Sequence, residues 1–277
     1  MKLFVTGGTG FIGSHFLKKS IEADHEVIAL KRSRHSVPRI TLDTQPLWLE
    51  KKLEEVSVED LKGVDAIVHL AAHSANVPYD SLENCIVENV IKPLKFFQIA
   101  KSADVENYLV AGSCFEYGLE GANYESIPSN AGLFPTSSYP ASKAAASVAF
   151  HAFACQEKIK LQILRIFHVF GEGEKETRFW PSLKKAAVSG EDFEMTLGNQ
   201  VRDFISVEEV AEKFLDALFA KVKTGKPVIS NLGTGAPSTL RDFATEQWKR
   251  FGGVGKLKFG AKSYRENEAM RFVPKVF

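Results

Sequence analysis

The residues with the clearest chemical content are Tyr139 and Lys143, four positions apart in the segment Tyr-Pro-Ala-Ser-Lys. On a helix, this spacing places both side chains on one face. A free phenol has a pKa of about 10, and a nearby ammonium group stabilises its phenolate form. The pair can therefore give a proton to a carbonyl oxygen or take one from an alcohol. Alone, Tyr-x-x-x-Lys is common on helix surfaces, so its meaning depends on the rest of the chain.

A glycine-rich loop near the start of the chain adds a binding site for phosphate. Residues 8–13 fit the pattern G-x-G-x-x-G, directly after an apolar strand predicted over 2–6 and before a helix predicted over 13–23. In this context the glycines let the backbone approach a pyrophosphate, to which the helix N-terminus offers N–H groups. The alternative is a plain glycine-rich turn. The predicted cofactor contacts in this loop are Gly7, Gly10, Phe11, Ile12 and Gly13.

The end of the next predicted strand, 26–30, indicates which dinucleotide fits. An acidic residue there would bind the ribose 2′-hydroxyl of NAD. This chain has Lys31 and Arg32 instead, and four cations without a carboxylate lie between positions 31 and 39. Such cations can pair with a 2′-phosphate. We therefore expect NADP(H) rather than NAD(H), although a basic segment of this kind can also be an ordinary solvated loop.

The elements that must position these residues alternate between strand and helix. Short apolar runs predict buried strands, and longer amphipathic stretches predict helices between them. This order indicates an α/β fold of the Rossmann type, with a doubly wound parallel sheet. The expected strands are 2–6, 26–30, 66–70, 107–111 and 161–167, and the expected helices are 13–23, 84–102 and 142–157.

The character of the sequence changes after about residue 170, where loops lengthen and glycines become frequent. We predict an NADP-binding domain over 1–168 and a mostly substrate-binding lobe over 169–277. A helix near 206–222, which begins with a capping-box pattern at Ser206, is expected to return to the first domain. The second lobe is the smaller of the two, and a truncation at the C-terminus is one explanation for its size.

Composition excludes several other classes of protein. The chain has 277 residues, a net charge of +1 and 25 % charged residues, so no overall field attracts nucleic acid or a membrane. No apolar run reaches the ~20 residues that span a bilayer, and the N-terminus lacks a signal-peptide pattern. We expect a cytoplasmic protein with three reduced cysteines and no metal site.

Together, the motifs resemble the extended short-chain dehydrogenase/reductase family, the epimerase/dehydratase type that includes UDP-galactose 4-epimerase. Nearly the whole chain takes part in the resemblance, and residues 115–118 and 264–268 look most like reductases of nucleotide-linked 4-keto-6-deoxyhexoses. The matching segments are 6–13, 69–72, 89, 113–118, 139–143, 164–167 and 202–205.

The resemblance implies roles for individual residues. Tyr139 would be the acid/base, and Lys143 would bind the nicotinamide ribose and lower the pKa of Tyr139. Ser113 would hydrogen-bond the substrate carbonyl. The other implied cofactor contacts are Leu70, Ala71, Ala72, Asn89 and Phe167. The implied substrate contacts are His73, Ser113, His168, Arg202 and Arg265, the two arginines for a diphosphate; for each arginine, a surface ion pair is the alternative.

Three functions remain open on the sequence. Relatives that dehydrate sugars carry acidic residues where this chain has Cys114 and Phe115, so dehydration is disfavoured. We expect NADPH-dependent reduction of a keto group on a nucleotide-linked sugar. The alternatives are a 4-epimerase with bound NAD and a non-catalytic NADP(H) sensor. No role follows for Glu116. The resemblance also implies a homodimer formed through the helices 84–102 and 142–157.

Overall fold

The centre of the molecule is a seven-stranded parallel sheet in the order β10-β6-β5-β4-β1-β2-β3. The computed structural model describes residues 1–266 and 268–276. This strand order confirms the predicted doubly wound Rossmann-type sheet. The strands are β1 (Lys2–Thr6), β2 (Glu26–Lys31), β3 (Leu47–Glu50), β4 (Ala66–His69), β5 (Asn107–Ser113), β6 (Lys160–Ile166) and β10 (Val228–Leu232).

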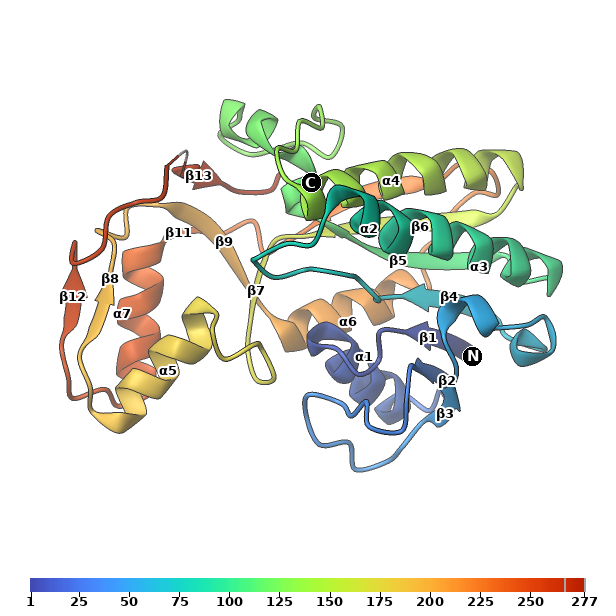
Figure 1. Cartoon of the computed structure of the whole chain (residues 1–277), viewed down its shortest axis with the longest axis horizontal. Helices are drawn as coiled ribbons and strands as arrows, with labels where there is room; N and C mark the ends of the chain where they lie inside the picture. Colours follow the sequence, from blue (N-terminus) through green and yellow to red (C-terminus); the bar gives the residue numbers. More distant parts are fainter. Residues whose placement is uncertain (267, 277) are drawn as a thin grey trace.

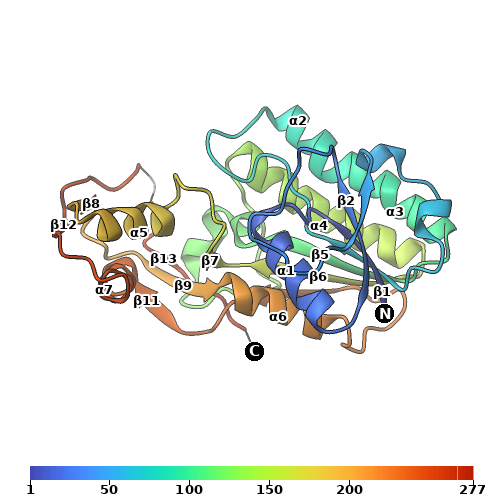
Figure 2. The ribbon, with the colours of Figure 1, turned by 90° about the horizontal axis from the view of Figure 1, so that it is seen from below.

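Helices cover both faces of the sheet, as Figures 1 and 2 show. The helices on one face pack against the sheet with the side chains of Phe16 and Phe214. The helices on the other face pack against it with the side chains of Phe97 and Phe150. The predicted helix 84–102 is divided by a π-helical turn, η3. The helices of these two layers are α1 (Phe11–Glu22), α2 (Leu82–Ile86), η3 (Val87–Ile91), α3 (Lys92–Ser102), α4 (Ser138–Gln156) and α6 (Val207–Ala217).

A smaller lobe, to the left in Figure 1, has its own core around Leu183 and Trp248. Its helices are α5 (Phe179–Ser189) and α7 (Leu240–Arg250). Its strands are β7 (His168–Phe170), β8 (Phe193–Met195), β9 (Val201–Ser206), β11 (Pro237–Thr239), β12 (Leu257–Phe259) and β13 (Arg271–Phe272). Short 3-10 turns elsewhere are η1 (Leu53–Glu55), η2 (Glu59–Leu61), η4 (Cys114–Tyr117) and η5 (Leu119–Asn123).

Two strands of the main sheet were absent from the sequence prediction, and one of them changes the proposed division of the chain. β10 forms an edge of the main sheet beside β6, although residues 228–232 fall within the segment assigned to the smaller lobe. Both β10 and β3 are short edge strands that bury few side chains, so neither has a strong apolar pattern. Ser206 caps α6 by accepting a hydrogen bond from the backbone N–H of Glu209, and α6 packs on α1.

Within the described residues, the helices lack the length and apolar character that a bilayer crossing requires.

Candidate active site

A large cavity, of about 1160 Å³, lies at the carboxyl ends of the parallel strands. Its walls include Thr6, which ends β1, Leu70, which follows β4, and Ser113, which ends β5. Ligands of doubly wound sheets bind at this edge. Most of the predicted site residues line this one cavity: Gly7, Gly10, Phe11, Ile12, Gly13, Lys31, Arg32, Leu70, Ala71, Ala72, His73, Ser113, Tyr139, Lys143, Phe167 and His168.

The loop between β1 and α1 has the close backbone packing that the glycine pattern predicts. Gly7 has φ +77°, and a side chain there would meet the backbone of Ala71 at 2.5 Å. A Cβ on Gly13 would lie 2.0 Å from the Gly7 carbonyl oxygen. Among the residues that the structure describes, no side chain caps the start of α1 at Phe11, so the first N–H groups of this helix are available to an anion such as a pyrophosphate. This cradle of backbone atoms fits a dinucleotide.

Cations surround the end of β2, where doubly wound folds hold the adenosine ribose. Lys31, Arg32 and Arg39 line the cavity there. Arg39 was not singled out from the sequence; its backbone N–H donates to Ser14 Oγ at 2.8 Å, which holds it beside the glycine loop. Of the carboxylates that line the cavity, Glu54 and Glu88 both form ion pairs with Lys92, which leaves the three cations for a ligand.

The predicted catalytic side chains come from β5 and α4. The helix begins at Ser138, earlier than predicted, because Pro140 lies in the first turn, where its missing N–H has no helical partner. Tyr139 and Lys143 thus lie one turn apart and are buried, as is Ser113 at the end of β5. Lys143 Nζ donates to the carbonyl oxygen of Ala111 at 2.7 Å.

The protonation of Tyr139 differs from the sequence expectation. Burial raises its pKa above the usual range of a phenol, and the charge of Glu116 raises it further, whereas hydrogen bonding to Ser113 lowers it. Lys143 was expected to lower this pKa, but its ammonium group is bonded to Ala111, and burial lowers the pKa of Lys143 itself. In this structure Tyr139 is therefore a neutral phenol at neutral pH, which suits a proton donor.

Asn89 lies behind the cavity rather than in its wall. Its side chain accepts a hydrogen bond from the backbone N–H of His73 at 2.7 Å and donates to Ser142 Oγ at 2.9 Å. Ser142 in turn donates to the carbonyl oxygen of Tyr139. Asn89 therefore joins the loop after β4 to the first turn of α4, and the cofactor contact that the resemblance implies for it stays a prediction.

The two arginines predicted to bind the diphosphate do not line the cavity. Arg202 forms an ion pair with Glu268 at 3.0 Å and donates to the carbonyl oxygen of Ala269 at 2.6 Å. Arg265 is exposed. Binding of substrate by these arginines stays a prediction. His168 does line the cavity, and burial lowers its pKa to about 3, so its ring is neutral.

The cavity wall also contains residues that the sequence analysis did not predict, because no motif marks them. The ring of Tyr79 lies 5.6 Å from that of Tyr139. Arg178 reaches the wall from the loop before α5, beside Glu174 at 3.3 Å. Burial raises the pKa of Glu174 to about 7. A raised carboxyl pKa and an ion pair in a cavity wall are typical of a functional site. Cys114 is also there, and burial raises its pKa to about 12, so its thiol is no base at neutral pH.

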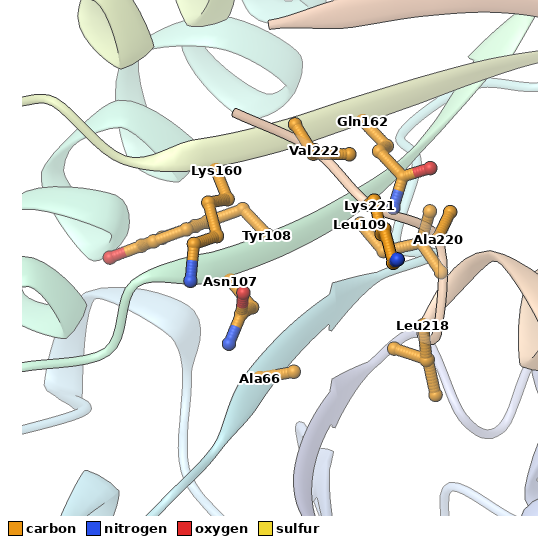
Figure 3. A pocket seen from close by; sticks show the side chains of 10 residues that line it. All are labelled: Ala66, Asn107, Tyr108, Leu109, Lys160, Gln162, Leu218, Ala220, Lys221 and Val222. Carbon is orange, nitrogen blue, oxygen red and sulfur yellow. The ribbon is translucent and has the colours of Figure 1, made fainter. Parts of the chain in front are cut away.

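A second cavity, of about 280 Å³, lies at the opposite edge of the sheet (Figure 3). Ala66, Asn107 and Lys160, which begin β4, β5 and β6, form part of its wall. It contains none of the predicted site residues and lies at the amino ends of the strands. The larger cavity is therefore the candidate active site.

Comparison with known proteins agrees with this geometry. The model of the NAD dependent epimerase/dehydratase family matches residues 3–233. A CDP-abequose synthase of Salmonella typhimurium is 29 % identical, with 97 % of this chain and 87 % of that protein covered. A UDP-glucose 4-epimerase of Lactobacillus helveticus is 27 % identical, with 84 % and 77 % covered. The solved structure of MoeE5 in complex with UDP-glucose and NAD has a TM-score of 0.83 and 25 % identity, and covers 100 % of this chain and 90 % of MoeE5.

Proposed function

We propose that this chain, which belongs to the NAD dependent epimerase/dehydratase family, reduces a keto group on a nucleotide-linked sugar with NADPH. The family assignment makes the chain an NAD(P)-dependent enzyme of nucleotide-sugar metabolism. The finer proposal concerns the direction of the reaction, the cofactor and the substrate, a nucleotide-linked sugar of the 4-keto-6-deoxyhexose type.

The observation that carries the proposal is the set of cations at the end of β2. Lys31, Arg32 and Arg39 face the cavity where a 2′-phosphate would lie, and the neighbouring carboxylates are engaged by Lys92. A site for NADPH favours a net reduction, because a reductase releases its oxidised cofactor after each turnover. The relatives named CDP-abequose synthase are consistent with a nucleotide-linked sugar as the substrate.

The site can perform the protein's part of such a reduction. When bound, the nicotinamide cofactor supplies the hydride. The glycine loop with Lys31 and Arg32 would bind the cofactor, and Ser113 would donate a hydrogen bond to the carbonyl oxygen of the substrate. Tyr139, a neutral phenol, would donate its proton to this oxygen as negative charge develops. Buried Lys143 would add positive charge near the same atom.

A 4-epimerase with bound NAD is the second candidate. The UDP-glucose 4-epimerases among the relatives and the NAD complex of MoeE5 favour it. An epimerase uses the same Ser, Tyr and Lys but regenerates its cofactor in every cycle. The two candidates therefore differ in whether cofactor is consumed.

The direct test is oxidation of NADPH, followed at 340 nm, with CDP-, UDP- and dTDP-linked 4-keto-6-deoxyglucose. We expect steady consumption of NADPH, in proportion to added substrate, with at least one of these sugars. UDP-glucose and UDP-galactose serve as epimerase controls. Interconversion of these two sugars, without use of NADPH on any keto sugar, would establish the epimerase instead.

The double variant Lys31→Ala/Arg32→Ala tests the cofactor preference. A charge-assisted hydrogen bond is worth about 1.5–3 kcal/mol, so loss of even one of the two contacts should raise the Kd for NADPH by about 10- to 160-fold, and loss of both by more. The Kd for NADH should change by less than about threefold, since NADH has no 2′-phosphate. Fluorescence titration of both nucleotides at one fixed salt concentration measures the two constants.

Arg34→Ala is the matched control, because Arg34 lies on the same loop but does not line the cavity. This variant should bind both nucleotides as the wild type does. Equal weakening of NADPH and NADH binding in the double variant, or tighter binding of NADH by the wild type, would contradict the NADPH assignment.

The surface also supports the homodimer that the resemblance implies. Leu82, Val87, Ile91 and Val148 expose large apolar side chains on α2, η3 and α4. Exposed apolar groups on neighbouring helices are typical of a surface that a partner covers.

A further inference from the structure

Glu116, for which the sequence suggests no role, has a fully buried carboxylate directly behind the active site. It lies in η4, immediately after β5. One carboxylate oxygen accepts the backbone N–H of Ser113 at 2.7 Å. The other accepts the hydroxyl of Ser147 and the Nε–H of Arg165, each at 2.7 Å. A buried carboxylate with three donors is well satisfied and has little freedom to move.

The three donors belong to three different elements of the site. Ser113 ends β5, Ser147 is on α4, and Arg165 is on β6. Tyr139, Lys143 and Ser147 follow one another at intervals of four residues, so they share one face of α4. The bond from Ser147 therefore holds the face that carries Tyr139 and Lys143 against the end of the strand that carries Ser113.

Arg165 completes the arrangement as the counter-charge. It is buried, and besides Glu116 its guanidinium donates to Tyr117 Oη at 3.1 Å and to the carbonyl oxygen of Ser129 at 2.8 Å. Burial of a carboxylate is costly unless a charged partner accompanies it. Arg165 supplies that partner and fixes the position of Glu116.

Gly112 provides the space for this carboxylate. A Cβ at that position would lie 3.0 Å from Glu116 Oε1 and 3.0 Å from Arg165 Cγ. The side chain of Glu116 can therefore fold back beneath β5 and reach the N–H of Ser113.

We propose that Glu116 is a positioning residue, which fixes Ser113 relative to Tyr139 and Lys143 through its bonds to Ser113, Ser147 and Arg165. This role rests on the reductase function proposed above. Glu116 touches neither cofactor nor substrate in this scheme, since it lies behind the cavity and does not line it.

The charge of Glu116 also acts on the two titrating groups. It raises the pKa of Tyr139, which Cys114 and Tyr79 raise as well. For Lys143 it opposes the lowering effect of burial. His69, which also lies near Lys143, is buried with a pKa of about 3 and is neutral. Glu116 thus favours the phenol and the ammonium, the two forms that a proton-donating site needs.

The variant Glu116→Gln retains the shape of the side chain and removes its charge. We expect kcat for the keto sugar to fall by about 10- to 100-fold, because small displacements of reacting groups cost up to about 100-fold. The KM for the sugar and the Kd for NADPH should change by less than about threefold. The pKa values of Tyr139 and Lys143 should both fall, so the alkaline limb of the kcat profile should move to lower pH.

The variant Ser147→Ala separates position from charge. It removes the bond between Glu116 and α4 but leaves the ion pair between Glu116 and Arg165 in place. We expect a fall in kcat of about 3- to 10-fold with no shift of the alkaline limb.

In the unliganded protein, hydrogen exchange of the Ser113 amide should become faster in Glu116→Gln, whose amide oxygen is a weaker acceptor than a carboxylate.

Asp60→Asn is the matched control for loss of a carboxylate. Asp60 accepts hydrogen bonds from the same kinds of donor, namely the ammonium of Lys51 and the N–H and hydroxyl of Ser57, but it does not line the cavity. This variant should lower Tm, with kcat and the pH profile of the wild type. If Glu116 only stabilised the fold, Glu116→Gln would likewise lower Tm and leave kcat and the pH profile unchanged.

The outcomes distinguish this proposal from the proposed function. If wild-type protein reduces a keto sugar and folded Glu116→Gln has wild-type kcat and pH profile, the positioning role is wrong. If Glu116→Gln does not fold, Ser147→Ala decides: a wild-type kcat overturns the role, and a reduced kcat at unchanged KM supports it. If wild-type protein reduces no keto sugar, the reductase function itself fails.

Discussion

The variant Tyr139→Phe should lower kcat for reduction of the keto sugar by about 10²- to 10⁴-fold, the usual contribution of a general acid. Phenylalanine keeps the ring that packs beside Tyr79 and removes only the hydroxyl that would protonate the substrate oxygen. The Kd for NADPH should stay within about threefold of the wild-type value, because the glycine loop and the cations at the end of β2 are unchanged. Single-turnover oxidation of NADPH and fluorescence titration measure the two effects separately.

Tyr124→Phe is the control for loss of a phenol elsewhere. The hydroxyl of Tyr124 donates to Glu120 at 3.0 Å, outside the cavity wall. This variant should retain wild-type kcat. Near wild-type turnover in Tyr139→Phe would remove Tyr139 from the role of proton donor.

The variant Gly13→Ala should abolish binding of the dinucleotide, with a rise in Kd of at least about 100-fold, or roughly 2.7 kcal/mol. The added methyl group would lie 2.0 Å from the Gly7 carbonyl oxygen and 2.9 Å from the Cα of Gly8. Both contacts are with backbone, so the loop itself has to move away from α1. Overpacking of this kind also costs about 1–3 kcal/mol of stability, which lowers Tm.

The control for this variant is Gly63→Asn. Gly63 has φ +72°, a conformation that asparagine tolerates, and a Cβ there has no neighbour within 4 Å. Binding of NADPH should be unchanged in this control. Wild-type affinity for NADPH in folded Gly13→Ala would show that the cofactor does not lie on this loop. Calorimetric titration, together with thermal unfolding of each variant, makes the comparison.

Much of the fold and of the site follows from local patterns. The predicted strand 2–6 coincides with β1, and the alternation of strands and helices predicts the parallel doubly wound sheet that the structure has. The spacing of Tyr139 and Lys143 needs only a helix to bring them to one face. The glycine loop needs only its neighbouring strand and helix. These features depend on residues close together in the chain, so periodicity and composition predict them.

Contacts between distant segments were not predictable in this way. β10 pairs with β6 although more than 60 residues separate their starts, and its short, half-exposed sequence carries no strong strand pattern. Arg178 and Glu174 reach the cavity from a loop whose course depends on the packing of the smaller lobe. Arg202 forms an ion pair with Glu268, which lies 66 residues further along the chain.

The sequence by itself determined the five inner strands of the sheet, the glycine loop and the one-turn spacing of Tyr139 and Lys143, because each arises from spacing within one element or between neighbours. Only the tertiary structure decided how that pair is protonated. Lys143 is bonded to Ala111, and burial keeps Tyr139 a phenol. The same holds for Glu116, whose partners Ser147 and Arg165 are 31 and 49 residues away. The pKa of a buried group depends on the charges and dipoles that folding places around it, and spacing along the chain does not specify these.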